Sequence, residues 1–330
     1  MKRFVRYFLT MLMLLSVFGC GSQNGKKVVE NTFQPRKFPS APKVPSIVTD
    51  PREASEYVIS NFWNEFLDPE KIFPCDSAMV NGVRNTDVES AIGMYVTLLE
   101  NGCTKDFARK SILSFFDMIE KFQAADTTSN MYSYMEKTVT RYLYDPNSPV
   151  RDEDIYQPFV SRLSTSPFTS EDMKWAYSHD AEMCSLNSFG TPAADFSFTD
   201  LSGKRHTLYG IDADYLLLFF SNPGCPACKE IVDQLCADEK VGRMISSGIL
   251  AVVNIYIDME LDKWREYAST YPKEWFSGYD HTYSIRTDVT YNVRAIPSLY
   301  LLDSEKKVIM KDAPQEKVIA FLDHIQQPEK

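Results

Sequence analysis

Two cysteines, Cys225 and Cys228, are separated by a proline and an alanine and form the one closely spaced pair among seven cysteines. An apolar run over residues 215–220 ends shortly before them, and a helical pattern begins at Cys225. The start of a helix favours a thiolate, because it offers partial positive charge and free backbone N–H groups. The pattern therefore predicts a pair that exchanges disulfides with other molecules.

The two thiols are expected to have different roles. Cys225 is the predicted nucleophile, whereas Cys228 lies one turn deeper and can attack the mixed disulfide that Cys225 forms. Pro226 removes one N–H donor from the first turn, which limits how strongly the helix stabilises the thiolate. Glu230 lies about 200° around the helix from Cys228, so no obvious proton acceptor is expected beside the pair. The alternatives are a purely structural disulfide and half of a zinc site, which would need further ligands.

The remaining cysteines give weaker signals. Cys236 follows Cys225 by eleven residues, about 16 Å along a helix, which is beyond disulfide reach, so we expect a small buried side chain. Cys75, Cys103 and Cys184 are compatible with one disulfide plus an odd thiol or with three unpaired thiols. The four histidines are isolated from one another in the sequence, and we expect no metal site and no cofactor.

The N-terminus predicts export and lipidation. Three basic residues precede an apolar run over 7–18 that is too short to span a bilayer, which is typical of a signal peptide. The run ends in Phe18-Gly19-Cys20, which resembles a bacterial lipobox and implies that Cys20 carries the lipid and begins the mature chain. The alternative is a plain signal peptide with an incidental Cys20. We expect the rest of the chain outside the cytoplasm, where disulfides persist, and facing the periplasm.

The chain divides into four predicted segments: a signal peptide at 1–19, a lipidated Cys20 with a flexible tether at 20–50, a helical domain at 51–187 and an α/β domain at 188–330. Four prolines and no hydrophobic period predict the tether. Apolar spacing predicts six helices in the next segment, with Asp50, Thr86 and Thr104 at N-terminal capping positions and Gly102 as a stop. A methionine and tyrosine stripe over 131–142 is interpreted as core rather than as a ligand groove.

The pattern changes near Gly190. Residues 194–199 alternate as a strand does and can pair with 205–208 across a turn-rich tetrapeptide. Continuous apolar runs at 215–220 and 249–257 predict buried central strands, and 299–302 with 308–310 predict an antiparallel pair before a C-terminal helix. An inserted helix is expected over 261–268. The predicted fold class is an all-α domain followed by an α/β domain with an N-terminal hairpin.

The order of strand, Cys225-Pro226-Ala227-Cys228, helix, strand and then Ile296-Pro297 before another strand resembles the thioredoxin fold. The leading hairpin and the insertion make it similar to the membrane-tethered TlpA/ResA-like thiol-disulfide oxidoreductases. This resemblance covers about 140 residues. It implies that Pro297 forms a cis peptide bond facing the cysteine pair and that the backbone of Ile296 binds an extended substrate chain.

Three positions depart from that family. The tryptophan usually found before the first cysteine is Gly224, the buried acid of thioredoxin is replaced by Phe219, and the ResA-type glutamate after the second cysteine is replaced by Ile231. Resolution of the mixed disulfide is therefore expected to be slow or assisted by water.

The formal charge of −10 excludes an overall electrostatic basis for nucleic-acid binding, and removing the three basic residues of the leader changes it to −13. The sequence predicts a membrane-tethered thiol-disulfide oxidoreductase of the cell envelope that reduces or exchanges protein disulfides. Its expected partners are disulfide-containing envelope proteins and a membrane electron donor. The alternative is a non-catalytic binding lipoprotein in which the thioredoxin-like domain is a scaffold.

Overall fold

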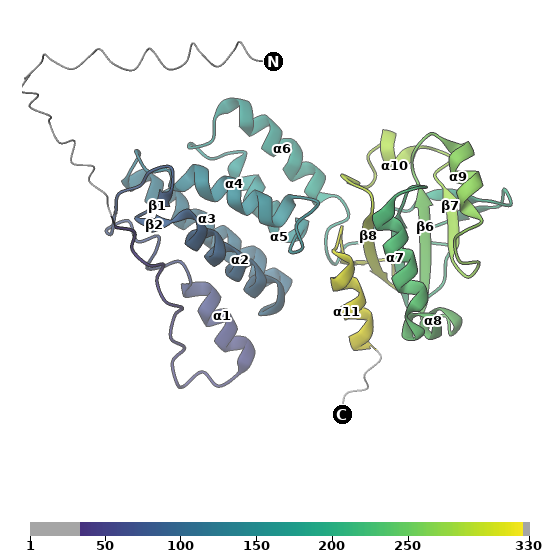
Figure 1. Ribbon diagram of the computed structural model, residues 1–330, viewed down its shortest axis with the longest axis horizontal. Coiled ribbons are helices and arrows are strands. Elements are labelled where there is room, and N and C mark those ends of the chain that lie inside the picture. Colours follow the sequence, from purple (N-terminus) through teal and green to yellow (C-terminus); the bar gives the residue numbers. More distant parts are fainter. Residues whose placement is uncertain (1–33, 326–330) are drawn as a thin grey trace, which may run out of the picture. The chain divides into compact units, whose positions relative to one another are not determined.

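Six helices fill the first half of the chain, as the sequence predicts (Figure 1). The computed structural model describes residues 34–325, so the predicted signal peptide and Cys20 lie outside the described residues. No helix in the described range is long and apolar enough to cross a membrane. The helices are α1 (Pro51–Asn61), α2 (Asn85–Asn101), α3 (Lys105–Ala125), α4 (Met131–Tyr144), α5 (Glu153–Leu163) and α6 (Glu171–Ser185).

Two of the three N-terminal caps that the sequence predicts are present in the structure. Asp50 and Thr104 accept hydrogen bonds from backbone N–H groups of the first turns of α1 and α3, and Gly102 ends α2. The predicted cap at Thr86 is wrong, because α2 begins one residue earlier and no side chain caps it. Glu89 lies three residues after Thr86, where the partner residue of a capping box would lie, and instead forms an ion pair with Arg141 of α4 at 2.7 Å. A tertiary contact has replaced the local one.

The core of the helical domain is rich in aromatic rings. Trp63 is fully buried and stacks on Phe115 of α3 with 4.6 Å between ring centroids. Met131 and Met135 of the predicted stripe are also fully buried, which confirms the core interpretation for both. Tyr142 differs, since it is only partly buried and lines a surface cavity described below. A short antiparallel hairpin that was not predicted, β1 (Met79–Val80) and β2 (Val83–Arg84), packs against this core.

Two side chains of the predicted tether over 20–50 pack against the helical domain. Arg36 donates its backbone N–H to the carbonyl of Gly82 at 2.8 Å, and its guanidinium lies 4.2 Å from the ring centroid of Phe73. The ring of Phe38 lies 5.0 Å from that of Phe66. The prolines that suggested an irregular chain therefore do not prevent packing, because an aromatic and an arginine side chain anchor this segment on the helical domain.

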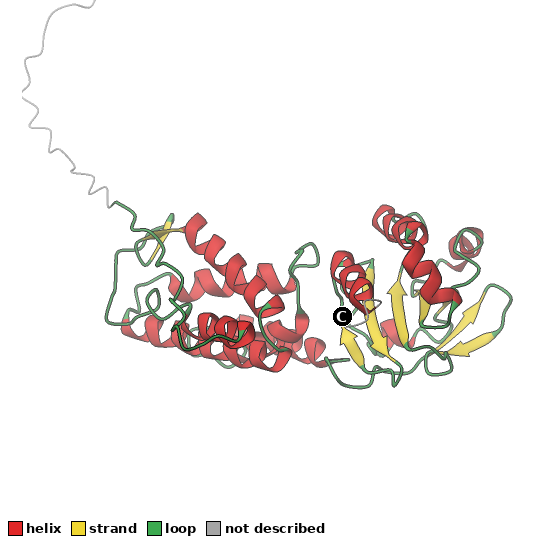
Figure 2. Cartoon of the chain, turned by 90° about the horizontal axis from the view of Figure 1, so that it is seen from below, coloured by secondary structure: helices red, strands yellow, loops and turns green. Residues whose placement is uncertain are grey.

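The second half of the chain contains a seven-stranded mixed sheet in the order β4-β3-β7-β6-β5-β8-β9. Figure 2 shows these strands in yellow. Strands β5 and β6 are parallel, and β8 pairs antiparallel with β5 on its other side. The strands are β3 (Ser197–Asp200), β4 (Arg205–Thr207), β5 (Tyr215–Phe220), β6 (Leu250–Tyr256), β7 (Phe276–Tyr279), β8 (Ser298–Asp303) and β9 (Val308–Met310).

Successive side chains of β5 point to opposite faces of the sheet and belong to two separate apolar cores. Leu217 and Phe219 pack beneath α7 (Pro226–Ala237), α8 (Glu239–Ser246) and α11 (Gln315–Ile325), whereas Leu216 and Leu218 face the opposite side with α10 (Ser284–Thr287). Strand β7 and the helices α8 and α10 were not predicted, while the inserted helix α9 (Leu261–Ala268) was.

Charged side chains join the helical domain to the sheet domain. Glu153 of α5 is almost fully buried, and Arg294 Nε donates to its carboxylate at 2.7 Å. Lys311 Nζ lies 2.9 Å from the second carboxylate oxygen and also donates to the backbone carbonyls of Cys184 at 2.7 Å and Leu186 at 2.6 Å. Buried charges are tolerated when such partners surround them. The apolar cores remain separate, so this ionic cluster is a main link between the domains.

A second set of contacts extends this link to the start of β8. Asp312 accepts hydrogen bonds from Arg294 Nη2 at 3.0 Å and from Ser298 Oγ at 2.7 Å. Arg151, in the loop before α5, donates Nε to the backbone carbonyl of Asp312 at 2.8 Å and Nη2 to that of Ala313 at 3.2 Å. The helical domain therefore contacts residues 312 and 313 directly, and Asp312 links this contact to Ser298 at the start of β8.

Asp152, the N-cap of α5, belongs to the same interface. Burial raises the pKa of its carboxyl, but the ammonium groups of Lys105 and Lys317 outweigh burial and lower the pKa below its ordinary value. Lys317 Nζ lies 3.3 Å from this carboxylate. One capping residue thus stabilises a helix start and an interdomain ion pair together.

Candidate active site

Cys225 and Cys228 form a disulfide at the N-terminus of α7. Cys225 is the N-cap residue, and its sulfur accepts a hydrogen bond from the backbone N–H of Cys228 at 3.1 Å. Cys225 is partly exposed, whereas Cys228 is 3% exposed and packs in the core beneath α7. A thiolate at Cys225 would keep this donor and the helix N-terminus, so the outer sulfur is the better-placed nucleophile.

The loop before the pair explains one departure from the thioredoxin pattern. Gly224 has φ +74°, a conformation that strains other residues, and no atom lies within 4 Å of the position that a Cβ would take. Further back in this loop, Asn222 donates to Asp258 at 2.7 Å, which ties it to the end of β6. The glycine allows the turn that brings Cys225 to the helix start.

The two positions that lack an acid are apolar and buried. Phe219 is fully buried and Ile231 is 4% exposed, and both belong to the apolar cluster that contains Cys228. Glu230, the residue before Ile231 on α7, is exposed. Within residues 34–325, these positions provide no carboxylate beside the inner sulfur. The expectation that water assists resolution of the mixed disulfide stays a prediction.

The Ile296-Pro297 peptide bond is cis, as the resemblance implied. Ile296 and the partly buried Cys225 pack against the same apolar cluster. Pro297 and Ala227, which lies between the two cysteines, line one groove of about 250 Å³. The structure thus brings together the sequence-predicted residues of the cysteine motif and the proline motif. Ser298, directly after Pro297, is held by Asp312.

This groove also contains residues that the sequence analysis missed. Asn147, Ser148, Pro149 and Arg151, from the loop between α4 and α5, form part of its wall. The sequence of this loop predicts only a turn. Nothing in it indicates that the helical domain contacts the region of the cysteine motif. The remaining lining residues are Glu230, Ile231, Leu299, Ala313, Pro314, Gln315 and Glu316.

The other described cysteines are free thiols. The prediction that Cys236 is buried is wrong: it is exposed, because the buried face of α7 consists of Cys228, Ile231 and Leu235. Burial raises the pKa of Cys236, raises that of Cys103 to about 11 and raises that of Cys184 further. These thiols remain protonated at neutral pH and are weak nucleophiles.

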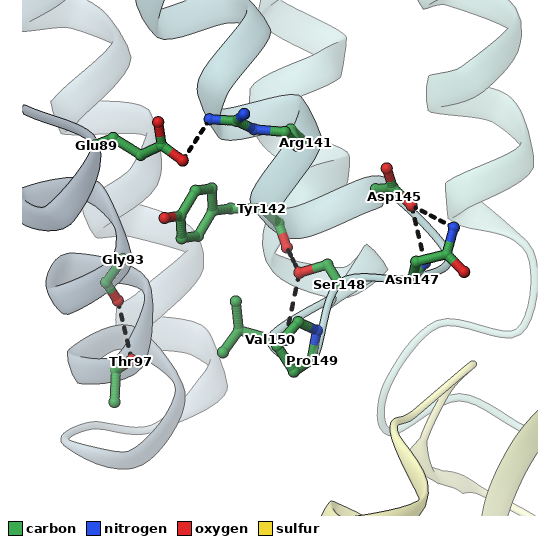
Figure 3. A pocket seen from close by; sticks show the side chains of 10 residues that line it. All are labelled: Glu89, Gly93, Thr97, Arg141, Tyr142, Asp145, Asn147, Ser148, Pro149 and Val150. Carbon is green, nitrogen blue, oxygen red and sulfur yellow. Dashed lines mark hydrogen bonds and ion pairs between the residues drawn. The ribbon is translucent and has the colours of Figure 1, made fainter. Parts of the chain in front are cut away.

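A larger cavity, of about 490 Å³, lies in the helical domain (Figure 3). Tyr142 projects into it, and the Glu89–Arg141 ion pair spans one end. Ser148 closes the other end, where its hydroxyl donates to the carbonyl of Tyr142. Over the part of the chain that the structure describes, no cluster of histidine, cysteine and carboxylate side chains could hold a metal ion.

The fold and the paired cysteines define a thioredoxin-like domain that follows a helical domain. The family model of DUF5106, a domain of unknown function, matches residues 19–187. A thioredoxin-like protein from Bacteroides caccae ATCC 43185 is 33% identical, with a TM-score of 0.73, over 88% of this chain and 100% of that chain. The chain therefore belongs to the DUF5106 family, together with a thioredoxin-like domain shared with this relative.

Two further solved structures match the second half of the chain. The C-terminal domain of an uncharacterised protein from Bacteroides fragilis NCTC 9343 is 43% identical over 42% of this chain and 98% of that chain, with a TM-score of 0.40. A domain of a possible thiol-disulfide isomerase from Cytophaga hutchinsonii ATCC 33406 is 23% identical over 42% of this chain and 92% of that chain, with a TM-score of 0.35. No curated protein matches the chain.

Proposed function

We propose that this protein is a TlpA/ResA-like thiol-disulfide oxidoreductase that reduces or exchanges disulfides in proteins of the cell envelope. The observation that carries the proposal is the asymmetry of the pair. The outer sulfur of Cys225 is partly exposed and accepts the N–H of Cys228, whereas the inner sulfur is buried. A structural disulfide requires no such difference, but an attacking and a resolving thiol do.

The reaction begins from the reduced pair. The Cys225 thiolate attacks one sulfur of a substrate disulfide, which forms a mixed disulfide and releases the other substrate sulfur as a thiolate. The Cys228 thiol then loses its proton to water and attacks Cys225, which releases the second substrate sulfur. The substrate gains two electrons, and the pair becomes the disulfide seen in the structure. A dithiol electron donor at the membrane reduces the pair for the next cycle.

Substrate binding is assigned to the cis-proline segment. The backbone of Ile296 is proposed to pair with an extended substrate chain, and Pro297 to place that chain beside Cys225. The groove shared by Ala227 and Pro297 supports this role, because a substrate cysteine there lies next to the motif. Ile296 and Pro297 thus bind substrate and take no part in bond making.

Insulin reduction tests this function directly. With dithiothreitol as the donor, the wild-type protein is expected to accelerate insulin precipitation, and Cys225→Ser to reduce the rate to that of dithiothreitol alone. Cys236→Ser is the matched control, since it removes an exposed thiol on the same helix and is expected to leave the rate unchanged. Equal rates for wild type and Cys225→Ser would contradict the proposal and favour the alternative, a non-catalytic binding lipoprotein.

The location forms part of the proposal and rests on the sequence. Cleavage before Cys20 and lipidation of this cysteine would anchor the protein at the membrane. Partition of cell extracts between a detergent phase and an aqueous phase tests the anchor. The wild-type protein is expected almost entirely in the detergent phase, and Cys20→Ala in the aqueous phase or uncleaved. Cys75→Ala is the control for loss of another cysteine. A wild-type protein that is cleaved elsewhere and stays in water would overturn the assignment of Cys20.

A further inference from the structure

The groove beside the cysteine pair has two walls from different domains. Ala227, Ile231 and Pro297 belong to the thioredoxin-like domain, whereas Asn147 and Pro149 come from the helical domain. Asn147, Ser148 and Pro149 also line the 490 Å³ cavity of the helical domain, so the same loop borders both hollows (Figure 3). A substrate chain that reaches the pair along this groove would meet the helical domain.

Several hydrogen bonds hold this loop in place. Ser148 Oγ donates to the carbonyl of Tyr142, and the backbone N–H of Asn147 donates to the carboxylate of Asp145 at 2.8 Å. Arg151 donates across the domain boundary to the backbone carbonyls of Asp312 and Ala313. The loop is thus a fixed wall rather than a segment that must fold around a ligand.

The charges that this groove presents are mainly negative. Glu230 and Glu316 are exposed, and within residues 34–325 neither carboxylate has an ion-pair partner. Arg151 is the cation of the groove and interacts electrostatically with Glu316. Its guanidinium is largely buried, however, and its N–H groups already donate to backbone carbonyls. A basic side chain is the natural complement of this surface.

We propose that the groove formed by the two domains selects substrates for the pair, and that the selected segment is an extended polypeptide with a lysine or arginine close to its target cysteine. Asn147 and Pro149 limit the width of the groove, and Glu230 and Glu316 attract the basic residue. The inference rests on the proposed function, because it describes how the substrate of Cys225 is chosen. It assigns the helical domain the role of one wall of the groove, and the thioredoxin-like domain the role of supplying the charge.

The experiment compares two disulfide-linked peptides that differ only in a lysine or a glutamate two residues from the cysteine. Reduction by the wild-type protein, with dithiothreitol as donor, is expected to be about fivefold faster for the lysine peptide, the effect of roughly one exposed ion pair. In Glu230→Gln/Glu316→Gln the ratio should fall towards one. Glu266→Gln, an exposed glutamate on α9 outside the groove, should leave the ratio unchanged.

A second variant tests the wall itself. Asn147→Trp places a large ring at the groove and is expected to slow both peptides by about tenfold, a steric cost of roughly 1.4 kcal/mol. Asn64→Trp, at an exposed site elsewhere in the helical domain, should have no effect. The small substrate 2-hydroxyethyl disulfide should be reduced equally by all variants, because it needs only the partly exposed Cys225 and not the groove.

The outcomes separate the two proposals. An unchanged peptide ratio in the double glutamine variant, or unchanged peptide rates in Asn147→Trp, would overturn the inference while reduction of the small disulfide continued. If the wild-type protein reduces neither the peptides nor the small disulfide, the proposed function itself is wrong, and substrate selection is excluded with it.

Discussion

Cys228→Ser is expected to accumulate mixed disulfides with substrate proteins, and Cys225→Ser to form at least about tenfold fewer. In the first variant, Cys225 retains its position at the helix N-terminus and the backbone N–H donor of residue 228, so attack continues. Resolution fails because no second thiol reaches the mixed disulfide. In the second variant the remaining thiol is buried in the apolar core below α7 and meets no substrate.

Non-reducing electrophoresis of acid-quenched cells, followed by mass spectrometry of the trapped species, measures this asymmetry and identifies the partners. Adding Cys236→Ser to the Cys228→Ser variant controls for trapping by the exposed thiol of α7, and the pattern should not change. Trapped partners linked to Cys236 would contradict the assigned nucleophile. The absence of mixed disulfides in both serine variants would leave a structural disulfide as the better interpretation of the pair.

Lys311→Met is expected to lower the free energy of unfolding by about 3–5 kcal/mol, the usual cost of removing one partner from a buried ion pair. The ammonium of Lys311 is fully buried between the domains. Its removal leaves one oxygen of Glu153 without its cation and the backbone carbonyls of Cys184 and Leu186 without their donor. Urea unfolding monitored by circular dichroism measures the change.

Two further variants make this result specific. Lys229→Met removes an exposed lysine that pairs with Asp233 on one helix, and should leave the unfolding curve almost unchanged. Lys311→Met/Glu153→Gln removes the uncompensated charge together with the cation and should recover part of the lost free energy. A Lys311→Met protein as stable as Lys229→Met would show that the buried cluster contributes little to the stability of the chain.

The burial of Cys236 is one property that the sequence predicted wrongly. A lone cysteine eleven residues after the motif suggested a buried small side chain, but burial depends on which face of α7 meets the sheet. Position 235 is buried and position 236 is not, since adjacent residues on a helix point about 100° apart. The same limit applies to residues 34–50, whose prolines indicated a tether although Phe38 packs into the aromatic core.

The sequence by itself determined the elements and the chemistry that depend on local order. Apolar periodicity located six helices and the buried strands, capping side chains placed the starts of α1 and α3, and the Cys225-Cys228 spacing placed two thiols on one helical turn. The thioredoxin resemblance added the cis bond before Pro297. Each of these features is fixed by residues within a few positions of one another.

Only the tertiary structure decided what lies next to the pair. Glu153 and Lys311 are separated by 158 residues, and the loop at Arg151 bonds to Asp312 across a similar distance in sequence. No local pattern indicates such partners. The sequence around a charged residue looks the same whether its side chain faces solvent or another domain. The helical domain became part of the site through these long-range ion pairs, which require the fold before they can form.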